Sequence, residues 1–413
     1  QREQRVGHAA PDGSEFSGET IRDADRFAAL AADWEAMYRA APRATPFQTH
    51  AWLAAWWRAY GGRRQLRVVA VRDASGRLVA AAPLYLRRRG PVRVLEPLGG
   101  AISDFTDVLV AEDLLAPEKV PAVVACLCTA LVESGRWDVL DLPEVRPGSA
   151  ADLLFDAWPA RRWSTRASAC LEVHANGFDD LLRRLPGKRA SELRRRLRRA
   201  DGLGIEVIVV PSEEAAEGVA EMIRLHAEQW EGRGGNPEHF RPRFAQHLSE
   251  AVTPMIRDRR AVLSRIRLGG ELMAVNLVLL GHDMAGGYLL GVRPGLYKKL
   301  DFFPYLLRQD LTTATERGLS VLSMLRGRES HKNRWNPVVR VSRRLILARA
   351  GMLLAYPYAG TVLTRARAVD RARRWAPWLR QAQQRVAILR NAVGRRGSGS
   401  VAAGASTERG RRP

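Results

Sequence analysis

The chain contains two successive stretches in which predicted helices and strands alternate, and this order restricts it to an α/β fold with mixed sheets. The second stretch is the clearer one. Turns at Gly269-Gly270 and at 281–283 join three apolar segments into an antiparallel meander, and a helix and a closing strand follow. The predicted elements are helices at 213–230, 240–252 and 304–317 and strands at 205–210, 261–268, 271–280, 284–291 and 319–325.

The first stretch has a similar pattern, with helices at 21–40, 51–60 and 118–134 and strands at 66–71, 78–86, 92–98, 105–110 and 137–142. A length of 413 residues suits two domains and an appendage. We therefore predict five parts, which are a disordered N-terminus at 1–19, domains at 20–168 and 169–340, a basic helical tail at 341–393 and a disordered end at 394–413.

Positive charge is concentrated in the tail. The net charge is +22, and residues 340–413 hold 17 Arg against two acidic residues. From Val362 onward, apolar residues recur every three or four positions with arginine on the opposite face, which predicts an amphipathic helix. Such a helix can pack on the other domains, contact a partner or lie on an anionic membrane. The arginine content can also reflect composition alone.

A second basic run extends from Arg183 to Arg199 and includes Arg189 and Arg195. One reading is a solvated helix face, with Leu193 and Leu197 as its buried stripe. The other is a docking surface for a polyanion, either tRNA or a phosphate-bearing acceptor. We carry Arg189 and Arg195 forward as candidate substrate-binding residues.

The sequence lacks the motifs that are typical of several other classes of protein, and this disfavours those classes. Three cysteines do not make a disulfide framework and fit a reducing compartment. Neither an apolar run of about 18 residues nor a secretory leader is visible, so we expect a cytoplasmic protein, with contact between 341–393 and the inner membrane face left open. No P-loop, dinucleotide fingerprint or metal-ligand spacing is present, and we expect no metal.

Three segments carry a resemblance to a known family. The first is Thr45-Pro46-Phe47-Gln48 with tryptophans at 52, 56 and 57; the second is Gly76–Val79 leading to Ala82–Tyr85, with Leu98-Gly99 and 104–110 after it; the third is the stretch 325–335, LRGRESHKNRW. Together, over about 20–340, they resemble the CelD-like acetyltransferases associated with bacterial cellulose synthesis, a tandem branch of the GNAT superfamily. The resemblance implies two GNAT-like domains, with the chemistry in the second.

The resemblance implies transfer of an acyl group from acyl-CoA, most simply acetyl-CoA, to an amine or hydroxyl. The acceptor would be a small molecule or a glycan or peptide precursor of the cell envelope, a polysaccharide or a secondary metabolite. The Fem-type transferases share the architecture and use aminoacyl-tRNA, which is the first alternative. The second alternative is a degenerate, non-catalytic pair of GNAT domains. It is considered because His331 replaces the family's Tyr, and because Phe302-Phe303 lie in the region where the family has a Ser-Pro-Gly loop.

The candidate site residues follow from their chemistry and from this resemblance. Glu329 and His331 are the types that can act as a general base near pH 7, and Tyr288 can reprotonate a departing thiolate. The alternative is that Arg326 and Glu329 form a local ion pair and Trp335 covers the core. The predicted catalytic residues are Glu329, His331 and Tyr288; the predicted carrier-binding residues are Tyr297, Lys298, Lys299, Arg326 and Lys332; Trp335 is predicted to bind substrate.

Overall fold

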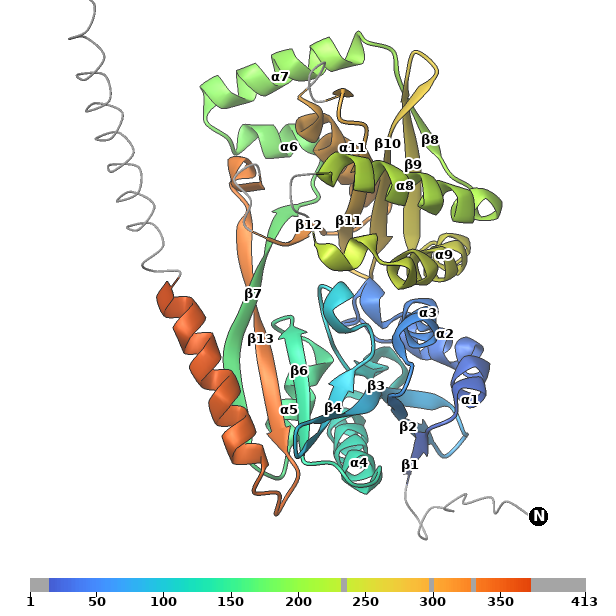
Figure 1. The fold of residues 1–413 in the computed structure, drawn as a ribbon, viewed down its shortest axis with the longest axis vertical. Coiled ribbons are helices and arrows are strands. Elements are labelled where there is room, and N and C mark those ends of the chain that lie inside the picture. The colour runs from blue at the N-terminus through green and yellow to red at the C-terminus, as the bar shows by residue number, and fades with distance from the viewer. Residues whose placement is uncertain (1–14, 232–235, 297–300, 328–331, 373–413) are drawn as a thin grey trace, which may run out of the picture. The chain divides into compact units, whose positions relative to one another are not determined.

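One mixed sheet runs through both predicted halves of the chain. In the computed structural model, which describes residues 15–231, 236–296, 301–327 and 332–372, thirteen strands belong to this sheet (Figure 1). Along the sheet the strands follow the order β1-β2-β3-β4-β6-β13-β7-β12-β11-β10-β9-β8, and β5 pairs with β3 off this path. Helices flank the sheet, so the α/β class predicted from the sequence is confirmed.

The first half contributes one end of this sheet and the helices that cover it. Its strands pair antiparallel except for β4 and β6, which run parallel. The elements are β1 (Phe16–Ile21), α1 (Ala24–Ala29), α2 (Ala31–Arg39), α3 (His50–Tyr60), β2 (Gln65–Asp73), β3 (Leu78–Arg89), β4 (Val92–Pro97), β5 (Leu109–Val110), α4 (Val120–Glu133), β6 (Val139–Val145) and α5 (Ala150–Ala157).

The second half contributes the other end of the sheet. The predicted meander is present as β9, β10 and β11, and β12 closes it in parallel with β11. The elements are α6 (Phe178–Arg183), α7 (Gly187–Asp201), β8 (Ile205–Val209), α8 (Ala215–Trp230), α9 (Pro242–Arg257), β9 (Ala261–Leu268), β10 (Glu271–Leu280), β11 (Met284–Val292), α11 (Phe302–Glu316) and β12 (Val321–Arg326).

Two long strands, β7 (Arg162–His174) and β13 (Val338–Ala348), carry the sheet from one half to the other (Figure 1). β7 pairs with β12 and with β13, and β13 also pairs with β6. The prediction that a helical tail begins at 341 is therefore wrong for residues 341–348. Their apolar side chains are buried at Leu345, Ile346 and Leu347, and Arg344 pairs with the buried Asp141.

The two ends of the chain differ from the prediction in smaller ways. Phe16–Glu19, predicted as disordered, pairs with β2 in β1, because Phe16 and Ile21 are buried. Residues 357–372 form a unit separate from Gln1–Tyr356 and are helical. The rest of the predicted tail at 373–393 and the predicted disordered segments at 1–14 and 394–413 lie outside the described residues.

Residues 98–108 fold as a loop against the sheet, although 105–110 is predicted as a strand. Only Leu109 and Val110 form a strand there. The Gln48 side-chain amide donates to the Phe105 carbonyl at 3.3 Å, and the Thr106 backbone N–H donates to the Glu144 carbonyl at 3.1 Å. This loop brings Ala101, Ile102 and Asp104 to the second half of the chain.

Aromatic side chains join the two halves between α3 and α9. Trp52 of α3 meets His247 of α9 edge to face, with ring centroids 4.4 Å apart, and meets Tyr288 of β11 at 5.1 Å. All three belong to, or pack against, one apolar cluster that draws residues from both halves. Buried aromatic pairs of this kind contribute packing beyond their area alone. The halves therefore share a core.

His247→Phe tests this shared core, because burial lowers the pKa of His247 to about 3. The unfolded pKa is about 6.5, so neutral His247 contributes stability that is full above pH 6.5 and is lost as pH falls toward 3. At pH 5 the loss is about 2 kcal/mol relative to pH 7. Phe cannot be protonated, so the free energy of unfolding in urea should fall less between pH 7 and pH 5 for the variant than for the wild type. An equal loss in both proteins would show that His247 is not held neutral.

Candidate active site

The parallel strands β11 and β12 separate part of the way along their length. They pair over Met284–Gly286 and Val321–Ser323. Beyond this point the β10–β11 register shifts between Leu277 and Val278, so that Tyr288 is an extra residue in β11. In β12 the register against β7 shifts after Ser323, where Leu325 takes a positive φ of 54°. Irregularities in both strands therefore open the sheet here.

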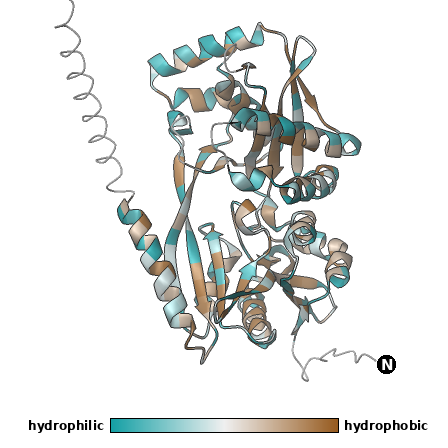
Figure 2. Ribbon diagram, in the orientation of Figure 1, coloured by the Kyte–Doolittle hydropathy of each residue, from teal (hydrophilic) through white to brown (hydrophobic). Residues whose placement is uncertain are grey.

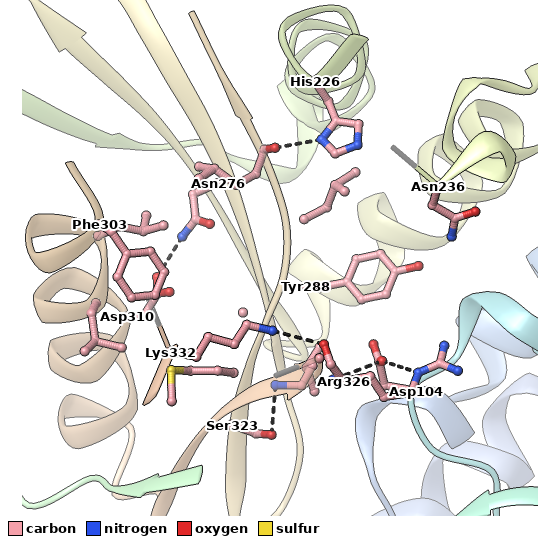
Figure 3. Close-up of a pocket in the computed structure, with 18 of the residues that line it drawn as sticks. Asp104, His226, Asn236, Asn276, Tyr288, Phe303, Asp310, Ser323, Arg326 and Lys332 are labelled. Atoms are coloured by element: carbon pink, nitrogen blue, oxygen red, sulfur yellow. Dashed lines mark hydrogen bonds and ion pairs between the residues drawn. The ribbon is translucent and has the colours of Figure 1, made fainter. Parts of the chain in front are cut away.

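A cavity of about 890 Å³ occupies this opening (Figure 3). β11 and β12 form its centre, α8 and α11 supply opposite walls, and the loop at 101–104 from the first half closes one side. Its lining mixes apolar residues with a few polar ones. Concave, mostly apolar pockets with a small number of polar groups are typical of ligand sites.

The loop from the first half is held to the second half by polar contacts at the cavity wall. The Arg326 side chain donates to Asp104 at 2.6 Å and to the Ala101 carbonyl at 2.8 Å, and Lys332 donates to the Arg326 carbonyl at 3.0 Å (Figure 3). Burial alone would lower the pKa of Arg326, but the charges of Asp104 and Glu144 outweigh it and raise the pKa. Arg326 is thus cationic and fixed in place.

Asp310 is the buried carboxylate of the cavity. It lies on α11, and Oδ1 accepts a hydrogen bond from the Asn276 side chain of β10 at 2.7 Å (Figure 3). A side chain at Gly287 would come within 3.3 Å of Oδ2, so that oxygen faces β11. Burial raises the pKa of Asp310 to about 7, and the Asn276 bond offsets part of that rise. Its carboxyl therefore changes charge near neutral pH.

A chain of hydrogen bonds connects two histidines at the α8 side of the cavity. His226 Nδ1 lies 2.9 Å from the Leu290 carbonyl, which can only accept, so Nδ1 carries the proton. His226 Nε2 then accepts from His239 Nδ1 at 3.3 Å, and His239 Nε2 accepts from Asn236 at 3.2 Å. Burial lowers the pKa of both histidines, that of His239 to about 4. Both rings are therefore neutral at pH 7.

The first half has a parallel pair of its own, but its opening is filled. β4 and β6 pair at Val94–Val139 and Leu95–Leu140. Past this point the Thr106 hydroxyl donates to the Pro143 carbonyl, and its backbone donates to Glu144. The 98–108 loop thus takes the position that the cavity has between β11 and β12.

The predicted site residues fall into three groups. Tyr288, Arg326 and Lys332 line the cavity. Trp335 is buried beside it, in edge contact with Phe178, while Arg189 donates to the Arg334 carbonyl and Arg195 is exposed on α7. Five predicted residues lie outside the described part of the chain, namely Tyr297, Lys298, Lys299, Glu329 and His331.

Sequence reasoning missed Asp310, Asn276, Asp104 and the histidine pair. Asp310 could have been found, because Leu307 and Ala314 flank it at helical spacing on the apolar face of a predicted helix. A lone carboxylate on such a face must be paired or shifted in pKa. Asp104 carried no such signal, because it lies in a loop whose partner is Arg326, far along the sequence.

The chain is an α/β protein with a cavity between two parallel strands, and part of it matches a GNAT family model. Residues 187–333 match the family model described as an acetyltransferase (GNAT) domain. Among solved structures, the chain is similar to FemX, with 10% identity and a TM-score of 0.55 over 79% of this chain and 96% of that one. It is also similar to a conserved protein of unknown function from Bacteroides thetaiotaomicron, with 13% identity and a TM-score of 0.52 over 80% of this chain and 100% of that one.

These structural likenesses establish the fold, and the predicted tandem GNAT-like architecture is confirmed. No protein with a curated description matches the sequence. Across the described ranges, no helix is both long enough and apolar enough to cross a membrane. In the same ranges, no group of three or more His, Cys, Asp or Glu side chains is placed to hold a metal ion.

Tyr288→Phe separates two roles for this tyrosine. Its hydroxyl donates to the Ile102 carbonyl at 2.9 Å, and burial raises its pKa well above the usual value. Loss of this bond across the two halves should lower the free energy of unfolding by about 1 kcal/mol. Chemical denaturation measures that loss. A variant of unchanged stability would contradict the bond to Ile102, and a transfer rate lowered at saturating substrate would support the predicted role as an acid.

Proposed function

We propose that this chain is a GNAT-type acyltransferase whose acyl donor binds between β11 and β12. The observation that carries the proposal is the opening of these parallel strands into a cavity of about 890 Å³, inside the segment that matches the acetyltransferase domain. Separated strands leave backbone N–H groups of β11 free of β12, and such groups can polarise a thioester carbonyl. The filled opening between β4 and β6 supports a single transfer site.

The donor we propose is acyl-CoA, and the acceptor is an amine or hydroxyl of a cell-envelope, polysaccharide or secondary-metabolite precursor, as the CelD-like resemblance implies. The acceptor nitrogen or oxygen attacks the thioester carbonyl carbon, the new C–N or C–O bond forms, and the C–S bond breaks. The acceptor loses one proton to a base, and the thiolate gains one. Positioning of the two substrates supplies much of the rate.

Asp310 is the described residue best suited to take the acceptor's proton. Its carboxyl lines the cavity, and its pKa of about 7 is close to the value at which a general base works best at neutral pH. Glu329 and His331, the bases proposed from the sequence, follow β12 directly in the chain. Substituting each of the three residues and measuring the pH dependence of the transfer rate decides among them.

Positive charge near the cavity supports an anionic donor. Lys332 and Arg334 contribute to its lining. Lys298 and Lys299 lie four and three residues before the first residue of α11 in sequence, and the N-terminus of a helix favours anions. We propose that Tyr297, Lys298, Lys299 and Lys332 bind the carrier, the lysines through its phosphates, while Arg326 holds the cavity wall.

A second candidate, transfer from aminoacyl-tRNA, is favoured by the surface of α7. Figure 2 shows this helix as mostly hydrophilic. Leu197 and Ala200 are buried, whereas Arg194, Arg195, Arg198 and Arg199 are exposed. A row of exposed arginines attracts a phosphate backbone, and its contribution falls steeply with salt.

Calorimetric titration with acetyl-CoA, free CoA and charged tRNA distinguishes the two donors. For the acyl-CoA reading we expect 1:1 binding of acetyl-CoA that weakens in Lys332→Ala and persists in an α7 variant with Arg194, Arg195 and Arg198 changed to Gln. Binding of charged tRNA alone, lost in the α7 variant and at high salt, would overturn acyl-CoA as donor.

Asp310→Asn tests the general base. In the wild type the transfer rate should rise with pH through about 7, as Asp310 loses its proton. The variant should lose this dependence and be slower by about 100-fold or more. Glu316→Gln is the matched control, because it removes an exposed carboxylate from the same helix. An unchanged pH profile in Asp310→Asn would assign the base elsewhere.

The Asn276→Ala variant tests independently whether Asp310 is the general base. Its hydrogen bond to Asp310 lowers the carboxyl's pKa, so its removal should move the rise in rate to higher pH. A merely structural role for Asn276 would lower stability without moving the profile.

A further inference from the structure

A second cavity, of about 690 Å³, lies at one end of the sheet in the first half of the chain. Seven arginines, one glutamine and one leucine line it. They come from residues 63–67, which lead into β2, from the end of β3, from the start of β4 and from Arg136, three residues before β6. The pairing of these strands explains why the side chains converge, since Arg88 of β3 lies directly opposite Arg93 of β4.

Carboxylates balance only part of this charge. The buried Asp138 accepts from Arg93 at 2.7 Å, and the buried Glu96 pairs with Arg89 at 2.5 Å and lies 4.0 Å from Arg87. Within the described ranges, no ion pair involves five of the lining residues, which are Arg63, Arg64, Arg67, Arg88 and Arg136. Burial and, to a smaller extent, the nearby charge of Arg22 lower the pKa of Arg67.

Part of the cavity is rigid. The Arg64 guanidinium lies 5.5 Å from the Tyr85 ring centroid and 6.0 Å from that of Trp56, and its Nη1 donates to the Tyr60 carbonyl. Tyr85 itself donates to Glu96 at 2.5 Å. Arg93 is fixed by three hydrogen bonds to Asp138. These residues hold fixed donors, while Arg63, Arg88 and Arg136 are exposed at the mouth.

Asp138 balances Arg93, but the five arginines without an ion pair leave positive charge around the cavity, and this charge favours a bound anion. Guanidinium groups bind phosphate oxygens in pairs through their planar fork. Several such groups around one cavity match a ligand with adjoining phosphates better than a single phosphate. Leu86 is the one apolar residue in the lining, so an acyl chain or an aromatic ring would find little to contact.

We propose that this cavity binds the oligophosphate group of a ligand, two or more phosphates joined in a chain, at a site distinct from the acyl-transfer cavity. Arg93 stands at the start of β4, and Ala101, Ile102 and Asp104 of the transfer cavity follow its other end. The four strand residues 94–97, which span roughly 13 Å, and the loop residues 98–100 separate them. The ligand can be a free oligophosphate or nucleotide, or the diphosphate headgroup of a lipid.

The test is calorimetric titration of the full-length protein with tripolyphosphate, with inorganic phosphate and sulfate as single-group controls. We expect 1:1 binding of tripolyphosphate and much weaker binding of the single groups. The triple variant Arg63→Gln, Arg88→Gln and Arg136→Gln should weaken binding by at least about tenfold, because each residue donates charged hydrogen bonds. All three residues are exposed, so the variant should keep its fold, which circular dichroism checks.

The matched control is the α7 variant with Arg194, Arg195 and Arg198 changed to Gln, which removes the same charge from another surface. The proposed site would be overturned if both variants lost tripolyphosphate affinity equally, or if the wild type did not bind tripolyphosphate. Displacement of tripolyphosphate by acetyl-CoA with identical stoichiometry would also overturn it, since the anion would then be in the transfer cavity. Acetyl-CoA binding should persist in the triple variant, so failure of this site and failure of the proposed transfer function are separate results.

A second experiment determines whether the phosphates belong to a lipid headgroup or to a free ligand. Co-sedimentation with phosphatidylcholine vesicles, with and without an isoprenyl diphosphate, tests a lipid headgroup. A lipid ligand is assigned if the wild type binds the diphosphate vesicles, the triple variant does not, and tripolyphosphate displaces the wild type from them. Binding of tripolyphosphate alone assigns a free ligand in solution. Vesicle binding that neither the triple variant nor tripolyphosphate reduces would contradict a role for this cavity at a lipid surface.

Discussion

Two parallel strands can hold a ligand between them only if their facing backbone groups are released from each other while their outer edges stay paired to the rest of the sheet. β11 and β12 meet this constraint by pairing for three residues and then diverging, with an extra residue at Tyr288 in one strand and a positive φ at Leu325 in the other. β10 and β7 remain paired to their outer edges. The opening is therefore built into a continuous sheet, and the cavity, its buried carboxylate and its charged wall all depend on it.

The first half of the chain serves the second in two ways. Its aromatic helix α3 shares a core with α9 and β11, and its 98–108 loop closes the cavity through Asp104 and Ile102. That same loop fills the equivalent opening between β4 and β6. One segment thus removes a ligand site from the first half and completes one in the second. The strands β7 and β13 hold the halves in one sheet, so this division of roles does not depend on a flexible linker.

The sequence predicted the meander and the helices around it because glycine turns and apolar periodicity are local signals. It did not predict β13, whose partner residues in β6 lie far back in the chain, as the pair Arg344–Asp141 shows. In the site, the polar residues after β12 were visible as a motif, and Arg326 and Lys332 do line the cavity. Asp310 was less visible, because its raised pKa comes from burial against β10 and β11, which is a tertiary effect.

Amide hydrogen exchange with and without acetyl-CoA tests the central claim that the acyl donor occupies the opening between β11 and β12. Ligand in this opening would cover backbone amides that neighbouring strands leave exposed, and slower exchange reports such protection residue by residue. The account predicts slower exchange at Tyr288–Val292 of β11 and Ser323–Arg326 of β12, with no change at β4 and β6. Protection confined to β4 and β6, or no protection at any strand under saturating acetyl-CoA, would contradict it.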